Sequence, residues 1–340
     1  MRHIQKSQLK EFSYDIHLSW YDLIFQIAED HQIDISQIIE PQKLTQRHSD
    51  IRRLRDILYR VVEASGDNLL PIKAAKNLHA LSFGVLSLVL WTSPNLYSLM
   101  KTCCEYGVLF GTPIRLLFKE TAEGNGEFWL IDNEPYNHQS VVTHVGLLLF
   151  ISTLIQIILK TTTEPDIQLT IHFANNEISS VTQQEIKETL NCQIYFDAPI
   201  TKITVPRKYL FSALRNTNNE INNINHTLLR KEVATIASSN IIIQSYRVFD
   251  EAQNLTDISG EKLARELNMS VRTLNRRLRE ANISYRGLID KYKLEKAIYL
   301  LHNPNISMTE ISYRLGFSDL STFSRAFKRW TGACPSKIKL

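Results

Sequence analysis

The chain has 340 residues, of which 44% are hydrophobic, 39 are Lys or Arg and 35 are Asp or Glu. This length and hydrophobic content predict two or three domains with buried cores and exclude a disordered or fibrous protein. The charge is unevenly distributed: residues 255–340 hold 16 Lys and Arg against 8 Asp and Glu, whereas residues 1–254 hold 23 against 27. The basic charge is therefore concentrated in the last quarter of the chain.

Cysteine spacing and hydropathy indicate a reduced, cytoplasmic protein with no metal, no other cofactor and no membrane partner. The four cysteines lack the CxxC or Cys/His spacing of metal sites, and the adjacent pair Cys103 and Cys104 has poor geometry for a mutual disulfide. Residues 1–19 are polar and of mixed charge, unlike a secretory signal. The most apolar stretch, residues 145–159, is shorter than the roughly 20 residues of a membrane span, so we expect a buried helix there.

Residues 1–210 are predicted to form a mixed α+β domain. Helical spacing of apolar residues recurs over residues 20–40, where Leu23, Ile24 and Ile27 face inward, and an apolar helix follows at 141–159. A loop containing Gly124, Asn125 and Gly126, all suited to positive φ, joins two short strands. The predicted strands are 114–119, 127–132, 166–173, 192–196 and 202–205, with a helix at 182–190. This order suits a sensor-like domain better than a doubly wound nucleotide-binding fold.

A second amphipathic helix, residues 50–64, carries arginines on its outer face. These are Arg52, Arg53, Arg55 and Arg60. They could contact nucleic acid, but the acidic residues interspersed among them favour a solvated charged face.

An asparagine-rich stretch, residues 216–225, marks a predicted boundary. Beyond it, apolar residues from Leu228 to Ile243 could form a helix that either packs on the first domain or pairs across a homodimer. Both alternatives remain open at this point. We therefore divide the chain into a domain at 1–210, a linker with a possible dimerisation helix at 211–254, and a C-terminal domain at 255–340.

Residues 255–340 are predicted to be all-α, with two helix-turn-helix units in tandem joined by a long helix at 285–302. In the first unit, Ser259 and Ser270 are placed to cap helices 261–268 and 271–281. In the second, Ser307 and Glu310 form a capping box, Gly316 supplies the turn, and a helix follows at 319–330.

The second helix of each unit has one apolar face and one polar face. Val271, Leu274 and Leu278 form the predicted buried stripe of the first, and aromatic residues form that of the second. Outward arginine and asparagine side chains suit guanine and adenine edges in the major groove. For the first helix alone a solvated basic face is the slightly better interpretation, and the second unit reverses that preference.

The C-terminal segment resembles the AraC/XylS family of bacterial transcription regulators over its whole DNA-binding domain. The resemblance is carried by residues 263–267, 270–278, 284–285 and, above all, 311–332 with Pro335. It implies that helices 271–281 and 319–330 enter successive major grooves of double-stranded promoter DNA, about 34 Å apart. The implied base-reading residues are Arg272, Asn275, Arg276, Leu320, Ser321, Thr322, Ser324 and Arg325, and the implied phosphate contacts are Ser270, Arg279, Lys328 and Arg329.

The N-terminal region looks like the effector-binding domain of the ornithine-regulator-like branch of this family, which is called arabinose-binding by type. Residues 79–96, 99–106, 192–199 and 205–210 carry this looser resemblance. It implies an unidentified small-molecule effector and an activator that recruits RNA polymerase. The effector-binding residues cannot be read from the sequence.

The alternative is an enzyme whose unrecognised N-terminal catalytic domain is tethered to DNA. Residues 1–254 contain no GxSxG, phosphate loop, HExxH or GxGxxG motif. Cys103 and Cys104 are the candidate nucleophiles, and buried apolar cysteines are the better interpretation. We therefore expect a regulator and not an enzyme.

Overall fold

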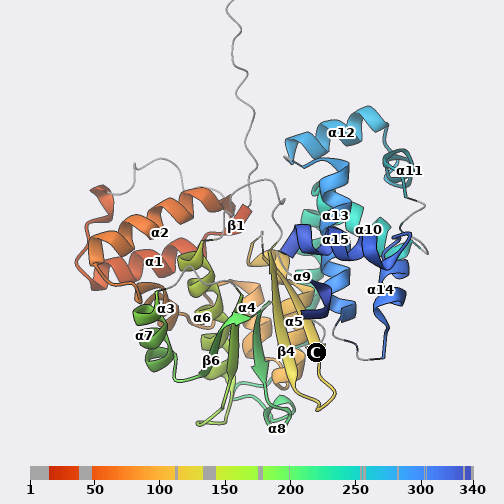
Figure 1. Ribbon diagram of the computed structural model, residues 1–340. Coiled ribbons are helices and arrows are strands. Elements are labelled where there is room, and N and C mark those ends of the chain that lie inside the picture. Colours follow the sequence, from red (N-terminus) through yellow and green to blue (C-terminus); the bar gives the residue numbers. More distant parts are fainter. Residues whose placement is uncertain are drawn as a thin grey trace, which may run out of the picture. The chain divides into compact units, whose positions relative to one another are not determined.

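The computed structural model describes residues 15–37, 48–111, 114–132, 143–174, 179–198, 200–252, 255, 258–281, 283–301, 303, 305–331 and 334–337. The chain forms two compact units, which divide between Val233 and Ala234 (Figure 1). We call them the N-terminal unit and the C-terminal unit. The first combines helices with a five-stranded sheet and the second is helical, which confirms the predicted fold classes.

Helices of the N-terminal unit pack around α6, the central apolar helix (His144–Thr161). This helix is long and apolar enough to cross a membrane by length and composition, but 67% of it is buried inside the protein, as predicted. The predicted inner face of α1 is confirmed, since Leu23, Ile24 and Ile27 are buried. The remaining helices before the sheet are α1 (Ser19–Asp30), α2 (Ile51–Ser65), α3 (Leu70–Lys76), α4 (Val85–Trp91) and α5 (Leu96–Glu105), with short 3-10 turns at Ile35–Gln37 and Gly107–Leu109.

The sheet has the strand order β3-β4-β7-β5-β6. Its strands are β3 (Ile114–Glu120), β4 (Gly126–Asp132), β5 (Thr170–Ala174), β6 (Gln193–Ala198) and β7 (Thr201–Val205). The only parallel neighbours in this sheet are β5 and β6, which α7 (Ser180–Leu190) connects. One row of apolar side chains crosses all five strands: Phe118, Phe128, Ile203, Ile171 and Ile194. Alternation along each strand therefore gives the sheet one apolar face.

The other face of the sheet carries a buried acid. Glu127 is only 5% exposed, and its carboxylate accepts hydrogen bonds from Lys202 Nζ at 2.7 Å, Trp129 Nε1 at 2.8 Å and Thr204 Oγ1 at 3.3 Å. A buried charge with this many donors is compensated. These contacts join β4 to β7 and fix their register.

The hairpin between β3 and β4 corrects one prediction. Gly124 has φ +81°, but Asn125 and Gly126 do not have positive φ. A Cβ at Gly126 would lie 2.7 Å from Leu210 in α8 (Arg207–Leu210), so close packing requires glycine there. The side-chain oxygen of Asn125 accepts the Arg207 backbone N–H at 3.0 Å. Asn125 therefore joins the hairpin to α8 and Gly126 leaves room for Leu210, while Gly124 supplies the positive φ.

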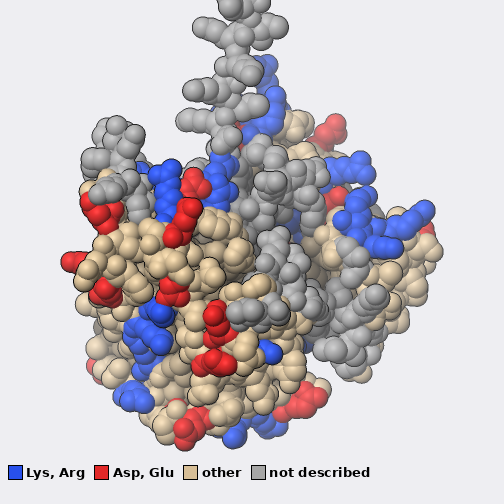
Figure 2. Space-filling model, turned by 60° about the vertical axis from the view of Figure 1, so that its left-hand side comes forward, with Lys and Arg blue, Asp and Glu red and all other residues tan. Residues whose placement is uncertain are grey.

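A two-stranded sheet of β1 (Asp15–His17) and β2 (His48–Asp50) was not predicted, because strands of three residues leave no periodic signal. The arginine-bearing helix α2 carries charges of both signs, and Arg55 pairs with Asp56 at 3.0 Å. Figure 2 shows acidic and basic side chains scattered over the visible face of the N-terminal unit. This mixture suits a solvated surface better than a nucleic-acid contact.

The asparagine-rich stretch is part of a helix and is not a free linker. It opens α9 (Asn219–Ser239), in which the division between the two units falls. Asn222 is buried, and its side-chain Nδ2 donates to the Val89 carbonyl at 2.8 Å. The predicted continuous helix through Ile243 is wrong, because Asn240 caps a new helix, α10 (Ile241–Glu251).

We predict that Asn222→Ala lowers the free energy of unfolding of the N-terminal unit by about 1 to 3 kcal/mol, because the amide is lost from a buried hydrogen bond. Urea denaturation of the full chain measures this loss. Asn223→Ala is the matched control, since Asn223 is the exposed neighbour. Equal losses in the two variants would contradict the assignment.

Candidate nucleic-acid interface

Two helix-turn-helix units are present at the predicted positions in the C-terminal unit. The first consists of α11 (Gly260–Glu266) and α12 (Val271–Glu280), and the second of α14 (Met308–Arg314) and α15 (Leu320–Thr331). The long helix α13 (Tyr285–Leu301) joins them, and a 3-10 turn follows at Pro335–Lys337. We call α12 and α15 the reading helices.

The core of the first unit includes α10. Ile241, Tyr246 and Phe249 are buried in one cluster with Leu274 and Leu278 of α12. The predicted linker at 211–254 therefore contains a helix that packs with the first helix-turn-helix unit. Ile241 is buried in this core and is unavailable for the dimer contact considered from the sequence.

The turns of the two units close in the same way. Asn268 and Gly316 have φ of 52° and 72°, and Gly316 supplies the turn as predicted. The following residue donates its N–H five residues back in each unit, Met269 to Ala264 at 2.9 Å and Phe317 to Ser312 at 3.0 Å. Asparagine tolerates the left-handed conformation, so it replaces glycine in the first unit without changing the turn.

The predicted serine caps are all present. The hydroxyls of Ser259, Ser270 and Ser307 each accept a hydrogen bond from the backbone N–H three residues later. These bonds satisfy donors that the first helical turn leaves unpaired. The Glu310 carboxylate accepts a hydrogen bond from Arg314.

Sequence reasoning missed the cap of the second reading helix, which is Asp319. Its carboxylate accepts hydrogen bonds from the Thr322 N–H at 2.7 Å, the Thr322 hydroxyl at 2.8 Å and the Ser318 hydroxyl at 2.9 Å. These bonds lower the pKa of Asp319 from 3.8 to about 2. An acidic residue three positions before a threonine at a helix start was the available signal.

The first reading helix presents its predicted polar face. Arg272, Asn275, Arg276 and Arg279 are exposed, whereas Leu274 and Leu278 are each 1% exposed. The prediction that Val271 is buried is wrong, since it is 41% exposed. Val271 is the first residue of the helix and lies beyond the buried stripe.

Two arginines of this helix already have partners. Arg276 Nη1 lies 2.6 Å from Glu280 Oε1, and Arg279 Nε donates to the Asn275 carbonyl at 3.1 Å. The pair between Arg276 and Glu280 is solvent-exposed, so little free energy opposes its exchange for another acceptor.

The second reading helix buries its aromatic side and exposes a side that includes three basic residues. Phe323 and Phe327 are fully buried and Trp330 is 8% exposed. Of the residues predicted to contact DNA, Leu320, Ser321, Arg325, Lys328 and Arg329 are exposed and Thr322 and Ser324 are half-buried. The Thr322 hydroxyl bonds to Asp319, and Arg329 pairs with Asp290 at 3.1 Å.

The helix between the units is held by polar contacts with α10. The Asp250 carboxylate accepts from the Tyr292 hydroxyl at 2.8 Å and pairs with Lys296 at 2.7 Å. Close by, the Tyr246 hydroxyl donates to Glu295 at 3.1 Å. The 17 residues of α13 extend about 25 Å at the usual helical rise. These contacts therefore fix the middle of α13 against α10.

Comparison with known proteins agrees with this architecture. Residues 38–214 match the family model for the arabinose-binding domain of AraC transcription regulators, and residues 263–339 match a helix-turn-helix domain model. The chain belongs to the AraC family of transcription regulators. The expected family is confirmed for both parts of the chain.

Known relatives match either most of the chain or about a quarter of it. The ornithine utilization regulator of Pseudomonas aeruginosa is 24% identical over 283 residues, which is 83% of this chain and 82% of that protein. An uncharacterised HTH-type transcriptional regulator of Mycobacterium bovis is 44% identical over 82 residues, 24% of this chain and only 22% of that relative. The crystal structure of CdpR from Pseudomonas aeruginosa aligns over 94% of this chain and 98% of its own, with 17% identity and a TM-score of 0.46.

The candidate nucleophiles of the enzyme hypothesis lie in α5. Cys103 is fully buried, and burial raises the pKa of both the Cys103 and the Cys104 thiols. A thiolate is therefore disfavoured at either position. Neither the family match nor these cysteines supports the enzyme alternative.

We predict that Asp319 stabilises the C-terminal unit in a pH-dependent way. Its pKa is lower in the folded protein than the ordinary 3.8, so its contribution is fully present above that pH and is lost as the pH falls through about 2. Asn at position 319 can also cap a helix but does not titrate. Urea unfolding between pH 5 and 2 should therefore show a steeper loss for the wild type than for Asp319→Asn, and parallel profiles would exclude this role.

Proposed function

We propose that this protein is a sequence-specific DNA-binding transcription regulator whose two reading helices enter successive major grooves of promoter DNA. The observation that carries the proposal is the pair of capped helices, each of which buries its apolar stripe and exposes arginine, asparagine, serine or threonine. Such side chains match the donor and acceptor patterns of base edges.

The helix that joins the two units supports binding to one face of the duplex. Successive major grooves on one face lie about 34 Å apart. The connector α13 is a continuous helix that contacts α10 through Asp250 and α15 through the pair of Asp290 with Arg329, so it is not a flexible tether. One chain would then contact two half-elements about one helical turn apart.

The exposed side chains divide into two proposed roles. Arg272, Asn275 and Arg276 of α12 read bases, and so do Leu320, Ser321, Thr322, Ser324 and Arg325 of α15. Leu320, 37% exposed, would pack on a thymine methyl group. Ser270, Arg279, Lys328 and Arg329 bind phosphates, which positions the helices without selecting sequence. Arg276 would exchange Glu280 for a base, and Arg329 would exchange Asp290 for a phosphate.

The other partners complete the proposed mechanism. The N-terminal unit would bind a small-molecule effector in the cytoplasm, and the DNA-bound protein would recruit RNA polymerase as an activator. The match to an arabinose-binding-type domain supports a ligand-binding role without identifying the ligand.

We predict that Arg276→Ala and Arg325→Ala each cost about 1 to 3 kcal/mol of binding free energy and relax specificity at one base position. Genomic fragments captured by the purified protein and then sequenced would show this as lost preference within one half-element. Lys328→Ala is the matched control, because loss of a phosphate contact weakens all sequences equally and lowers the salt slope by about one. If all three variants lost affinity uniformly, the two arginines would be phosphate contacts.

The exposed apolar residues of α9 support a homodimer. Ile221, Ile224 and Leu228 are 44%, 65% and 47% exposed, and their spacing places them on one face of the helix. A second copy of the same helix would cover this stripe. We propose this face for the contact, because Ile241 of the segment first considered is buried.

We predict that Ile224→Glu combined with Leu228→Glu yields a monomer, because burying these charges in the interface is unfavourable. Sedimentation equilibrium should then give 39.3 kDa for the double variant and twice that for the wild type. Asn223→Glu lies on the opposite side of the helix and should leave the dimer intact. A wild-type mass of a single chain would refute the dimer.

A further inference from the structure

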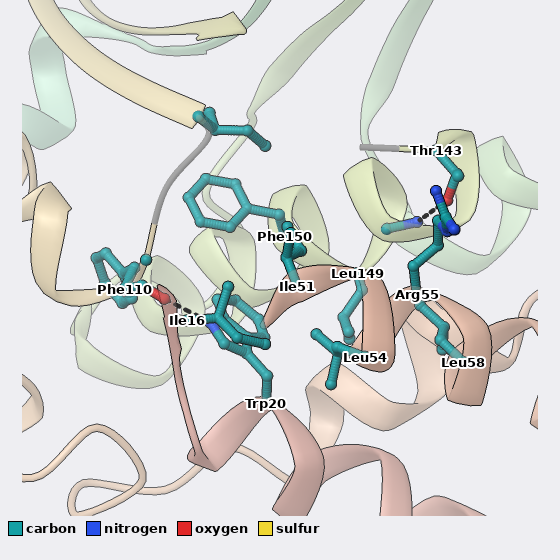
Figure 3. A pocket seen from close by; sticks show the side chains of 13 residues that line it. Ile16, Trp20, Ile51, Leu54, Arg55, Leu58, Phe110, Thr143, Leu149 and Phe150 are labelled. Atoms are coloured by element: carbon teal, nitrogen blue, oxygen red, sulfur yellow. Dashed lines mark hydrogen bonds between the residues drawn. The ribbon is translucent and has the colours of Figure 1, made fainter. Parts of the chain in front are cut away.

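A cavity in the N-terminal unit lies between α1, α2 and the first turns of α6 (Figure 3). It encloses about 540 Å³ of space free of protein atoms, part of which is open to solvent. Neither the sequence nor the family match indicates which residues bind a ligand, and this cavity supplies a specific site.

The wall at one end of the cavity is aromatic. The rings of Trp20 and Phe150 lie 5.6 Å apart between centroids, and those of Phe110 and Phe150 lie 6.0 Å apart. The indole Nε1 of Trp20 donates to the Phe110 carbonyl at 2.7 Å, so its polar atom is already used. Aliphatic residues continue the wall: Ile16, Ile51, Leu54, Leu58, Ile114 and Leu149.

Two of the described residues that line the cavity have polar side chains, Arg55 and Thr143. In Figure 3 Arg55 extends toward Thr143, and the aromatic rings lie at the other end. Arg55 is 33% exposed and pairs with Asp56, which is 61% exposed and does not line the cavity. An exposed ion pair is weak, so the guanidinium can turn to another carboxylate at little cost. No acidic residue is among those lining the cavity in the described part of the chain.

We propose that this cavity binds an apolar monocarboxylate, with its hydrocarbon body between the aromatic and aliphatic walls and its carboxylate on Arg55. The inference rests on the proposed function, in which this ligand is the effector. A planar guanidinium at one end of an apolar chamber complements a single anionic group. Among the described lining residues a sugar would find hydrogen-bond partners only at Arg55 and Thr143, and a diamino acid would find no acidic partner for its amines.

Isothermal titration of the full chain with decanoate tests the head group. Decanoate should bind at least tenfold more tightly than decanol, while L-arabinose and L-ornithine should give no heat from this site. Arg55→Met keeps the apolar stem and removes the charge, so it should weaken decanoate at least tenfold and leave decanol unchanged. Arg60→Met, on the exposed part of the same helix, is the matched control and should bind like the wild type.

A second variant tests the body of the ligand and guards against misfolding. A Cβ at Gly146 would meet only Thr143 Oγ1, at 3.6 Å, so this lining position accepts a side chain. Gly146→Leu should fill the cavity and weaken decanoate and decanol together at least tenfold. Its melting temperature should not fall, since leucine is the better helix former.

Two results would overturn the inference: equal affinity for decanoate and decanol, or equal decanoate affinity in Arg55→Met and Arg60→Met. Capture of genomic DNA fragments by the same protein preparations tests the proposed function independently of the ligand. Selective DNA capture without decanoate binding would reject the ligand class alone. If decanoate bound but DNA capture were unselective both with and without decanoate, the proposed regulator function would be rejected. The proposed ligand site would then still be supported.

Discussion

The arrangement of the reading helices depends on how α13 is held. A helix that only connected two units by its ends would leave them free to pivot. Here one carboxylate, that of Asp250, accepts from Tyr292 and pairs with Lys296, while Tyr246 bonds to Glu295 one turn along. These polar contacts lie beside the apolar cluster that includes Phe249 and Tyr292, so packing and hydrogen bonding fix the same helix face.

The N-terminal unit separates its polar and apolar features in a comparable way. One face of its sheet carries the apolar row through Phe128 and Ile203, and the other carries the compensated carboxylate of Glu127. The cavity lies on the helical side of the unit, where α1, α2 and α6 do not fill the space between them. A single arginine at the margin of that space gives an otherwise apolar site its chemical preference.

Local signals in the sequence were sufficient for the helix-turn-helix units. Ser259, Ser270 and Ser307 cap helices because capping involves residues only three positions apart, and Asn268 and Gly316 supply turns for a similar reason. Gly126 was misinterpreted as a turn residue with positive φ. Its lack of a side chain instead makes room for Leu210, which lies far along the chain.

The cavity could not have been predicted, since residues from 16 to 150 line it and no sequence spacing relates them. The spacing of apolar residues in α2 correctly predicted that Arg55 lies on the outer face of the helix. It could not indicate that this part of the face borders the cavity. Asn222 was assigned to a linker by composition, whereas its hydrogen bond to Val89 depends on a residue more than a hundred positions earlier. Tertiary contacts of this kind override local composition.

The two units share one turn geometry, with an N–H bonded five residues back after Asn268 and after Gly316, yet their reading helices expose different side chains. In the proposed complex the two units of one chain would follow one another along the duplex and would not be related by a two-fold axis. A site contacted in this way has a left and a right end, and turning the duplex around gives a different arrangement. A single bound chain would consequently face one flank of its site, which a two-fold symmetric reader of a palindrome cannot do.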